Sequence, residues 1–241
     1  MAGLALVVAL GGSYWLLMSP FAPSSRAYPY RGRTTERVVA LTFDDGPNEP
    51  YTSQILEILA THGIRATFFH VGRCVERHPE IALRAVDAGH VLGNHSLSHR
   101  FGTYLRPRAY EREVERTQQI LERITGRTPA LARTPWLWRQ PALLRMMRRR
   151  GLHPVAGEFG HALEVFQPSG PRMARRAIAK TRPGSILIFH DGFDSRGGNR
   201  AETVVAVRET IEGLLALGYR FVTVDELLGV PAYQPSDARP S

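Results

Sequence analysis

The sequence has a single cysteine, Cys74, and a single lysine, Lys180, among its 241 residues. One cysteine excludes an internal disulfide and a cluster of thiolate metal ligands, so we expect Cys74 to be a small buried residue. The formal net charge of +9 comes almost entirely from arginine. These arginines are scattered, with only 148–150 as a tight run. This scatter argues against nucleic acid as a partner and leaves attraction to an anionic envelope polymer open.

Charged side chains are also absent from the first 18 residues, which are mostly apolar. Such a length suits a membrane span or the apolar part of an export signal. We therefore expect residues 1–23 to be a signal peptide or membrane anchor, followed by a linker at 24–36. The protein is then expected to be exported and membrane-anchored, in the cell envelope or outside the cell. Residues 231–241 are rich in proline and serine, and we expect a disordered tail there.

Residues 37–230 alternate short apolar runs with amphipathic stretches of helical period, which predicts one α/β domain. The predicted strands are 38–43, 66–71, 90–93, 130–133, 152–157, 185–189 and 219–224. Seven strands that alternate with helices predict a parallel sheet closed as a TIM-like barrel, with an open doubly wound sheet as the alternative. In either fold, functional groups should gather at the carboxyl ends of the strands.

The first predicted strand runs directly into Asp44 and Asp45, which a Gly-Pro pair follows. Two adjacent carboxylates repel each other, so a metal ion and a cation nearby would be needed to keep both charged. Taken alone, these residues fit a solvated Asp-Asp-Gly turn, which is common, better than a metal site. The ends of the other strands decide between the two interpretations.

Histidine and arginine follow three further strands: His95 and His99 the third, Arg133 the fourth and His190 the sixth. Two histidines four residues apart would face one point on a helical turn, which suits two metal ligands. This spacing is a weak signal by itself, and Ser96 stands where a zinc protease carries glutamate, which argues against a peptidase. One aspartate with two histidines leaves positions open for water and is typical of a catalytic metal site.

Four motifs occur in a fixed order: T-F-D-D-G-P at 42–47, N-H-S-L-S-H at 94–99, R-T-P-W at 133–136 and I-L-I-F-H-D-G at 186–192. Together they resemble the motifs of the NodB-homology polysaccharide deacetylases, carbohydrate esterase family 4, from about Arg37 to Leu228. The resemblance implies a distorted TIM-like (β/α)7 barrel. It also implies hydrolysis of N-acetyl groups in polymers that contain N-acetylglucosamine, such as peptidoglycan or chitin oligomers. One divalent ion is implied, usually Zn²⁺, with Co²⁺, Mn²⁺ or Ni²⁺ as alternatives.

The resemblance assigns roles to individual residues of this chain. The implied metal ligands are Asp45, His95 and His99. The implied acid–base groups are Asp44 as general base, His190 as general acid and Arg133, which orients the base. The implied substrate contacts are Pro135 and Trp136 in the groove and Ile188 in the acetyl pocket.

The chain departs from the family pattern after the fifth predicted strand. There the family carries an Asp-Trp pair whose aspartate partners the catalytic histidine, whereas residues 155–166 contain neither residue type. Three possibilities are open: Glu164 replaces that aspartate, Glu158 replaces it, or no residue does. We favour Glu164 because it lies farther past the strand end, near the place of the missing residue.

The leading prediction is a metal-dependent de-N-acetylase that acts as a monomer. One alternative is a weakly active or inactive relative that binds glycan in the same groove, and another is an O-acetyl esterase of the same fold. A peripheral protein that binds an anionic polymer by charge alone is a third alternative, and it would need no metal.

Overall fold

The computed structural model describes residues 28–235. The predicted signal or anchor at 1–23 lies outside this range, as do residues 236–241 of the predicted tail. Among residues 28–235, no helix has both the length and the apolar character to cross a bilayer.

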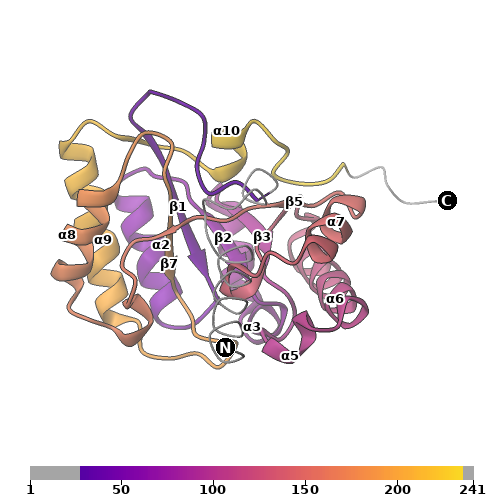
Figure 1. The fold of residues 1–241 in the computed structure, drawn as a ribbon. Helices are drawn as coiled ribbons and strands as arrows, with labels where there is room; N and C mark the ends of the chain where they lie inside the picture. The colour runs from indigo at the N-terminus through magenta and orange to yellow at the C-terminus, as the bar shows by residue number, and fades with distance from the viewer. Residues whose placement is uncertain (1–27, 236–241) are drawn as a thin grey trace, which may run out of the picture.

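Eight strands form one parallel sheet, coloured from indigo to yellow along the chain in Figure 1. They are β1 (Val38–Asp44), β2 (Thr67–His70), β3 (Val91–Asn94), β4 (Leu131–Ala132), β5 (His153–Pro154), β6 (Glu158–Phe159), β7 (Ile186–His190) and β8 (Arg220–Phe221). Their order is β5-β4-β3-β2-β1-β7-β6, and β8 pairs with the start of β1. This parallel sheet with its helices is a distorted (β/α)7 barrel, which confirms the predicted fold class.

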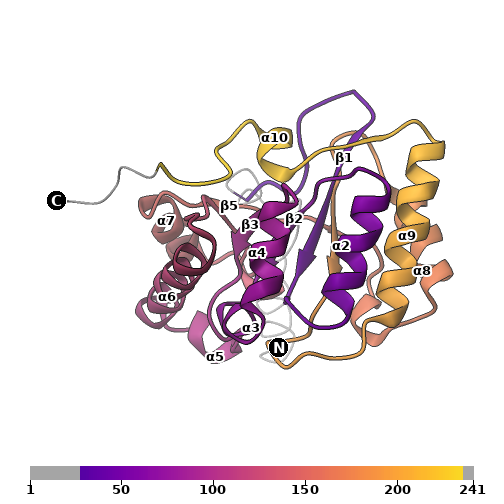
Figure 2. The same ribbon diagram turned by 180° about the vertical axis from the view of Figure 1, so that it is seen from behind.

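The helices are α2 (Tyr51–Thr61), α3 (Gly72–Arg77), α4 (Pro79–Asp87), α5 (Phe101–Tyr104), α6 (Pro107–Thr125), α7 (Pro141–Arg149), α8 (Gly170–Lys180), α9 (Ala201–Ala216) and α10 (Val224–Leu228). Two 3₁₀ turns, η2 (Pro135–Leu137) and η3 (Glu164–Phe166), interrupt long connections. Helices α2, α4 and α9 lie over one face of the sheet (Figure 2). Helix α10 lies at the end where β1 begins, opposite the carboxyl ends of the strands (Figure 1).

Strand β1 is buried along its whole length because structure covers both of its faces. Successive side chains of a strand point to opposite faces. Leu41 and Phe43 belong to the apolar cluster shared with α2 and α9, and the Phe43 ring stacks on Phe68 at 4.8 Å. Thr42 and Asp44 consequently point to the other face, toward the interior of the barrel.

The strand register brings the carboxyl ends of the central strands to one level. Asp44 is paired with His190 between β1 and β7, and His70 with Asn94 between β2 and β3. Residues that follow these strands therefore begin at the same edge of the sheet. This edge is where the sequence placed its candidate functional groups.

The structure differs from the predicted elements in several places. Strands β4 and β5 have two residues each, and α3, α5 and β6 were not predicted. The predicted helical turn at 95–99 was wrong, because this segment is an irregular loop in which Ser96 has φ 67° and His99 has φ 53°. Short elements of this kind carry too few residues to produce a recognisable period.

Both flanks of the sheet domain contact it where they are described. The hydroxyl of buried Tyr28 lies 2.8 Å from Oγ1 of Thr134, and the amide of Gly32 donates to the carbonyl of Gly184 at 2.8 Å. At the other end, the amide of Gln234 donates to the carbonyl of Thr128 at 2.8 Å. The predicted domain limits of 37 and 230 stay a prediction.

Candidate active site

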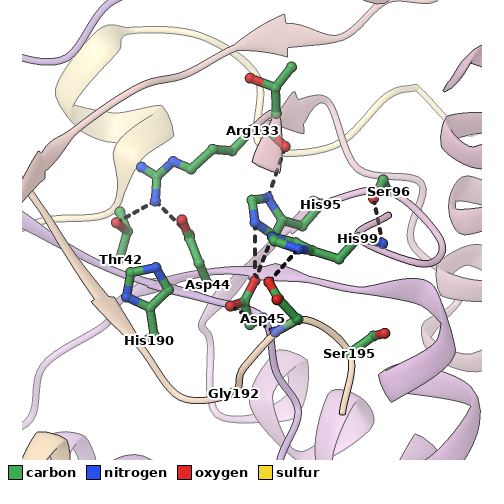
Figure 3. Close-up of polar contacts among 12 residues, drawn as sticks. Thr42, Asp44, Asp45, His95, Ser96, His99, Arg133, His190, Gly192 and Ser195 are labelled. Carbon is green, nitrogen blue, oxygen red and sulfur yellow. Dashed lines mark hydrogen bonds and ion pairs between the residues drawn. The ribbon is translucent and has the colours of Figure 1, made fainter. Parts of the chain in front are cut away.

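The carboxyl ends of four parallel strands bring the predicted acid–base and metal-binding residues together (Figure 3). Asp44 ends β1 and lies beside His190, which ends β7. His95 directly follows β3, and Arg133 directly follows β4. Side chains that are far apart in the sequence meet here because parallel strands end at the same edge of a sheet.

Asp45, His95 and His99 form a candidate metal site. Their ligand atoms all lie within 4.8 Å of one another, and the three side chains are buried. Oδ1 of Asp45 is 3.4 Å from Nε2 of His95 and 3.1 Å from Nε2 of His99. The two histidines converge from the loop that follows β3, and their rings point at Asp45 in Figure 3.

A contact on the far side of each imidazole ring sets its orientation. Nδ1 of His95 donates to the carbonyl oxygen of Arg133 at 2.9 Å. Nδ1 of His99 lies 2.8 Å from Oδ1 of Asp194. Each Nε2 atom is thereby turned toward Asp45, and such a contact on the opposite nitrogen is usual for histidines that bind metals.

Asp194 was not among the predicted site residues. Besides its contact with His99, its backbone N–H donates to Oδ2 of Asp45 at 3.3 Å, and its own Oδ2 accepts from Arg196 at 3.1 Å. The sequence offered one signal, an acidic residue soon after the H-D-G motif. Its approach to His99 depends on how the loop after β7 folds back, which no spacing reveals.

The surroundings of Oδ1 of Asp45 indicate whether these residues fit a metal ion. This oxygen is buried and makes no hydrogen bond of ordinary geometry with the described residues, which is costly for a carboxylate. A divalent ion would give it a partner. One carboxylate oxygen and two imidazole nitrogens are ligands that zinc and similar ions accept, so the residues present fit such an ion.

The charges of Asp45, His95 and His99 also fit a site that binds a cation. Burial alone would raise the pKa of Asp45, but the nearby His99 and His95 hold it well below its ordinary value. Burial alone would lower the pKa of His99, but Asp45 and Asp194 raise it to about 10. With no ion bound, His99 therefore carries a proton near neutral pH, and a cation that binds here must displace it.

Arg133 holds Asp44 in a single orientation. Its Nη1 donates to Oδ1 of Asp44 at 2.6 Å and to Oγ1 of Thr42 at 2.8 Å. Its Nη2 and Nε donate to the carbonyls of Ala156 at 2.8 Å and Val155 at 3.2 Å. The guanidinium is fully buried, and its donors are fixed by the backbone around it, so the carboxylate it contacts is fixed as well.

Glu164 contacts His190 on the opposite side of the cavity. Oε2 of Glu164 accepts from Nδ1 of His190, and Oε1 accepts from Oγ1 of Thr203 at 2.6 Å and from the backbone N–H of His190 at 3.2 Å. The structure therefore places Glu164 where the sequence analysis expected a partner for this histidine. Glu158 lies elsewhere and accepts from Arg31 and Ser185.

The carboxylate changes how His190 titrates. Burial would lower the pKa of His190, but the charge of Glu164 and the hydrogen bond to it outweigh burial and raise the pKa to about 9. Burial would raise the pKa of Glu164, but His190 holds it below its usual range. His190 is thus cationic at neutral pH, with Nδ1 engaged and Nε2 not used by Glu164.

A cavity of about 390 Å³ lies over these groups. Asp44, Asp45, His95, His99 and His190 line it together with mainly apolar side chains. The apolar lining residues are Trp136, Leu137, Phe159, Ala162, Val165, Phe166 and Phe193. An apolar cavity with a few convergent polar groups is the usual form of a ligand-binding site.

Trp136 is the one predicted groove residue that lines this cavity. Its ring contacts the His99 ring edge to face, with 4.4 Å between the ring centroids. The backbone of Trp136 is in the left-handed region, with φ 51°. Pro135 and Ile188 are buried and do not line the cavity. The sequence analysis missed Phe159 and Phe166, which are partly or largely exposed aromatic residues in the segment that departs from the family pattern.

An α/β barrel that gathers a buried carboxylate, a cationic histidine and a candidate metal site around one cavity has the architecture of a hydrolytic enzyme. The chain belongs to the polysaccharide deacetylase family, whose family model matches residues 31–155. The resemblance to the NodB-homology deacetylases is confirmed, and the protein is a hydrolase that acts on N-acetyl amide bonds of glycans.

Individual relatives agree with this assignment. A peptidoglycan-N-acetylglucosamine deacetylase of Bacillus cereus is 30% identical over 194 residues, which cover 80% of this chain and 89% of the relative. A chitooligosaccharide deacetylase of Rhizobium leguminosarum bv. trifolii is 34% identical over 195 residues, which cover 76% and 88%. The crystal structure of a peptidoglycan N-acetylglucosamine deacetylase with a bound N-hydroxybenzamide superimposes with a TM-score of 0.82 at 28% identity, covering 90% of this chain and 100% of that one.

Proposed function

We propose that this deacetylase removes N-acetyl groups from a polysaccharide that contains N-acetylglucosamine, with one divalent ion held by Asp45, His95 and His99. One observation carries the proposal: a metal-ligand set, an oriented carboxylate and a cationic histidine line the same cavity. Zinc is the ion we propose, because the ligands are two imidazoles and one carboxylate, with Co²⁺, Mn²⁺ and Ni²⁺ as alternatives.

The bound ion would supply a Lewis acid that polarises the acetyl carbonyl and makes a water molecule more acidic. Asp44 accepts the proton of the attacking water. Arg133 orients the Asp44 carboxylate. Its Nη1 contacts Oδ1 of Asp44, and three other acceptors hold the guanidinium in place. A fixed carboxylate needs no reorientation when the proton moves, which is how a positioned base accelerates hydrolysis.

His190 donates a proton to the leaving amine. An amine leaves an acyl centre readily only when it is protonated, so this role needs a cationic histidine at the working pH. Glu164 supplies that state, since it raises the pKa of His190 to about 9 against the effect of burial. Because Glu164 contacts Nδ1, the proton to be donated is on Nε2.

The apolar lining of the cavity supports a sugar substrate. Sugar rings have apolar faces that pack on aromatic side chains, and Trp136, Phe159 and Phe166 lie around the acid–base groups. Relatives named for peptidoglycan and for chitooligosaccharide both match most of the chain. We propose an envelope location to match such a polymer, with residues 1–23 as export signal or membrane anchor, and a monomeric enzyme.

The alternative of a relative that binds glycan without turnover requires a defect in the acid–base groups. The segment without the family's Asp-Trp pair was the place to expect one, but there Glu164 contacts His190 and Thr203. This contact supports an active enzyme. The O-acetyl esterase stays an alternative that the substrate panel below separates.

The test is acetate release by the purified protein from chitooligosaccharide, peptidoglycan glycan and acetylxylan, with the metal content measured in the same samples. We expect release from the N-acetylated glycans, its loss after chelation, and its return with zinc or cobalt. His95→Ala should bind no ion and release no acetate. Full activity in protein shown to be metal-free by elemental analysis would contradict the proposed metal site, and release from acetylxylan alone would favour the esterase.

A further inference from the structure

A second cleft of about 640 Å³ lies behind the wall of the active-site cavity. His99, Trp136 and Asp194 line both hollows and separate them. Ligands that occupy the two hollows at once would therefore be neighbours. The cleft was not expected from the sequence, because its arginines come from α3, from the loop before α5 and from the loop after β7.

Positive charge dominates this cleft. Its charged lining residues, His99 aside, are Arg73, Arg77, Arg100, Arg196 and Asp194. The single carboxylate is already engaged, because Asp194 contacts Nδ1 of His99 through one oxygen and Arg196 through the other. The lining thus holds an excess of cations with no carboxylate left to neutralise them.

Two of the four arginines already have partners within the protein. Arg77 donates to the carbonyl of Ser195 and lies 3.2 Å from Sγ of Cys74, and Arg196 donates to Asp194 at 3.1 Å. Arg73 and Arg100 are exposed, and their side chains make no hydrogen bond or ion pair with the described residues. Guanidinium groups that converge on a cleft without internal partners are suited to bind carboxylate or phosphate.

We infer that this arginine cleft binds an anionic substituent of the same glycan chain whose acetyl group reacts in the neighbouring cavity. The inference rests on the proposed function and narrows its substrate class to a carboxylate-bearing N-acetylated glycan, rather than a neutral polymer of N-acetylglucosamine. Peptidoglycan has this chemistry, because alternate sugars carry a lactyl ether that a peptide with free carboxylates extends. The net charge of +9 would attract such a polymer from a distance.

The experiment compares four substrates and two matched double variants. Arg73→Gln/Arg100→Gln removes the unpartnered guanidiniums, and Arg145→Gln/Arg208→Gln removes the same charge from exposed positions on α7 and α9. Each protein is assayed for acetate release from neutral chitopentaose and from soluble peptidoglycan strands. The same strands with amidated carboxylates are a third substrate, and strands that carry phosphate but no carboxylate are a fourth.

We expect the cleft variant to lose about tenfold in kcat/KM on the carboxylate-bearing strands, since two exposed charge contacts of this kind are worth about that much. Its kcat/KM on chitopentaose and on the amidated strands should stay within about twofold of the parent. The control variant should match the parent on every substrate. A similar loss of the cleft variant on the phosphate-bearing strands would identify phosphate as a second anion that the cleft binds.

Equal losses on charged and neutral substrates, or no loss on either, would overturn the inference while leaving the deacetylase proposal intact. Arg73→Gln alone is the second variant, because Arg73 is on α3 and is not next to a proposed metal ligand in the chain. It should lose less kcat/KM on the carboxylate-bearing strands than the double variant, and again little on chitopentaose. Calorimetric titration of the Asp44→Asn protein with the charged strands gives a readout independent of turnover. If no protein released acetate from any substrate, the proposed function would fail. The same titration with Arg73→Gln/Arg100→Gln added to Asp44→Asn would still decide whether the cleft binds carboxylates, because only the cleft is lined by these two arginines.

Discussion

Asp44 and His190 line the same cavity, but different kinds of structure hold them. Asp44 is oriented by Arg133, whose guanidinium also donates to Thr42 in β1 and to the carbonyls of Val155 and Ala156 beside β5. Thr42 accepts through its side chain in β1, and the two carbonyls belong to residues that directly follow β5. The orientation of Asp44, the proposed base, therefore depends on where the strands of the sheet end.

The acid side depends on a connection between elements. His190 ends β7, but its partner Glu164 comes from η3. The ring of Phe159 stacks on the His190 ring, with 5.9 Å between the ring centroids. The connection that carries both residues contains only a two-residue strand and one 3₁₀ turn between β5 and α8. The proposed base is thus held between two strand ends, whereas the proposed acid depends on an irregular connection. Changes on the two sides should therefore produce different defects.

Replacing the base should give the largest effect. Asp44→Asn keeps the shape of the side chain but cannot accept the water proton, and we expect kcat to fall about a thousandfold. The metal content should stay at the parent level, because Asp45, His95 and His99 are untouched. Elemental analysis together with acetate release measures both. Loss of the ion in parallel with activity would mean that the roles of Asp44 and Asp45 are reversed.

Arg133→Ala should produce the next largest defect and should also destabilise the fold. The substitution leaves the buried Asp44 without its cation, which costs about 3–5 kcal/mol in comparable buried pairs. We expect a loss of about a hundredfold in kcat, milder than that of Asp44→Asn. Thermal unfolding and acetate release are measured on the same preparation. Arg208→Ala, an exposed arginine on α9, is the control and should leave both unchanged.

Glu164→Gln should change the pH dependence more than the maximal rate. The acid must be protonated, so activity falls as pH rises through the pKa of His190, about 9 in this structure. Without the carboxylate that pKa should drop to 6.5 or below, which shifts the alkaline limb to lower pH and costs about thirtyfold at pH 8. At pH 5.5 the loss should be small, because His190 is then still largely protonated.

Glu158→Gln is the matched control for this substitution. Glu158 pairs with Arg31 and Ser185 and does not contact His190, so the alkaline limb should stay where the parent has it. An unshifted limb in Glu164→Gln, with His190→Ala inactive, would show that the comparison between the two sides is wrong and that the acid works without this carboxylate.

Asp194→Asn should have the smallest effect on activity and should act through the metal. The amide can still contact Nδ1 of His99, but it no longer carries the charge, and the loss of such partners typically weakens metal binding about 10- to 100-fold. Competition with a chelator of known affinity measures this change. Saturating zinc should restore kcat, whereas a defect that zinc does not restore would place Asp194 in the chemistry itself.

The two sides also differ in how far the sequence predicted them. Asp44 ends a strand with a clear apolar run, and Arg133 ends the fourth predicted strand, so their meeting could be predicted from the fold class. Glu164 was selected only by its distance past a strand end, and Phe159 and Phe166 gave no signal at all. Asp194 was missed because its approach to His99 depends on how the loop after β7 folds back. Loop conformation depends on tertiary contacts that no local period encodes.

Arg133 touches both functional centres at once. Its backbone carbonyl accepts from Nδ1 of His95, and its guanidinium donates to Asp44. A small displacement of the His95 ring, such as an ion of different radius would require, is therefore transmitted to the base through one residue. Exchanging the proposed metal ion should change the orientation of Asp44 as well as the Lewis acidity of the site, so we expect rates with different ions not to follow the acidity of the ions.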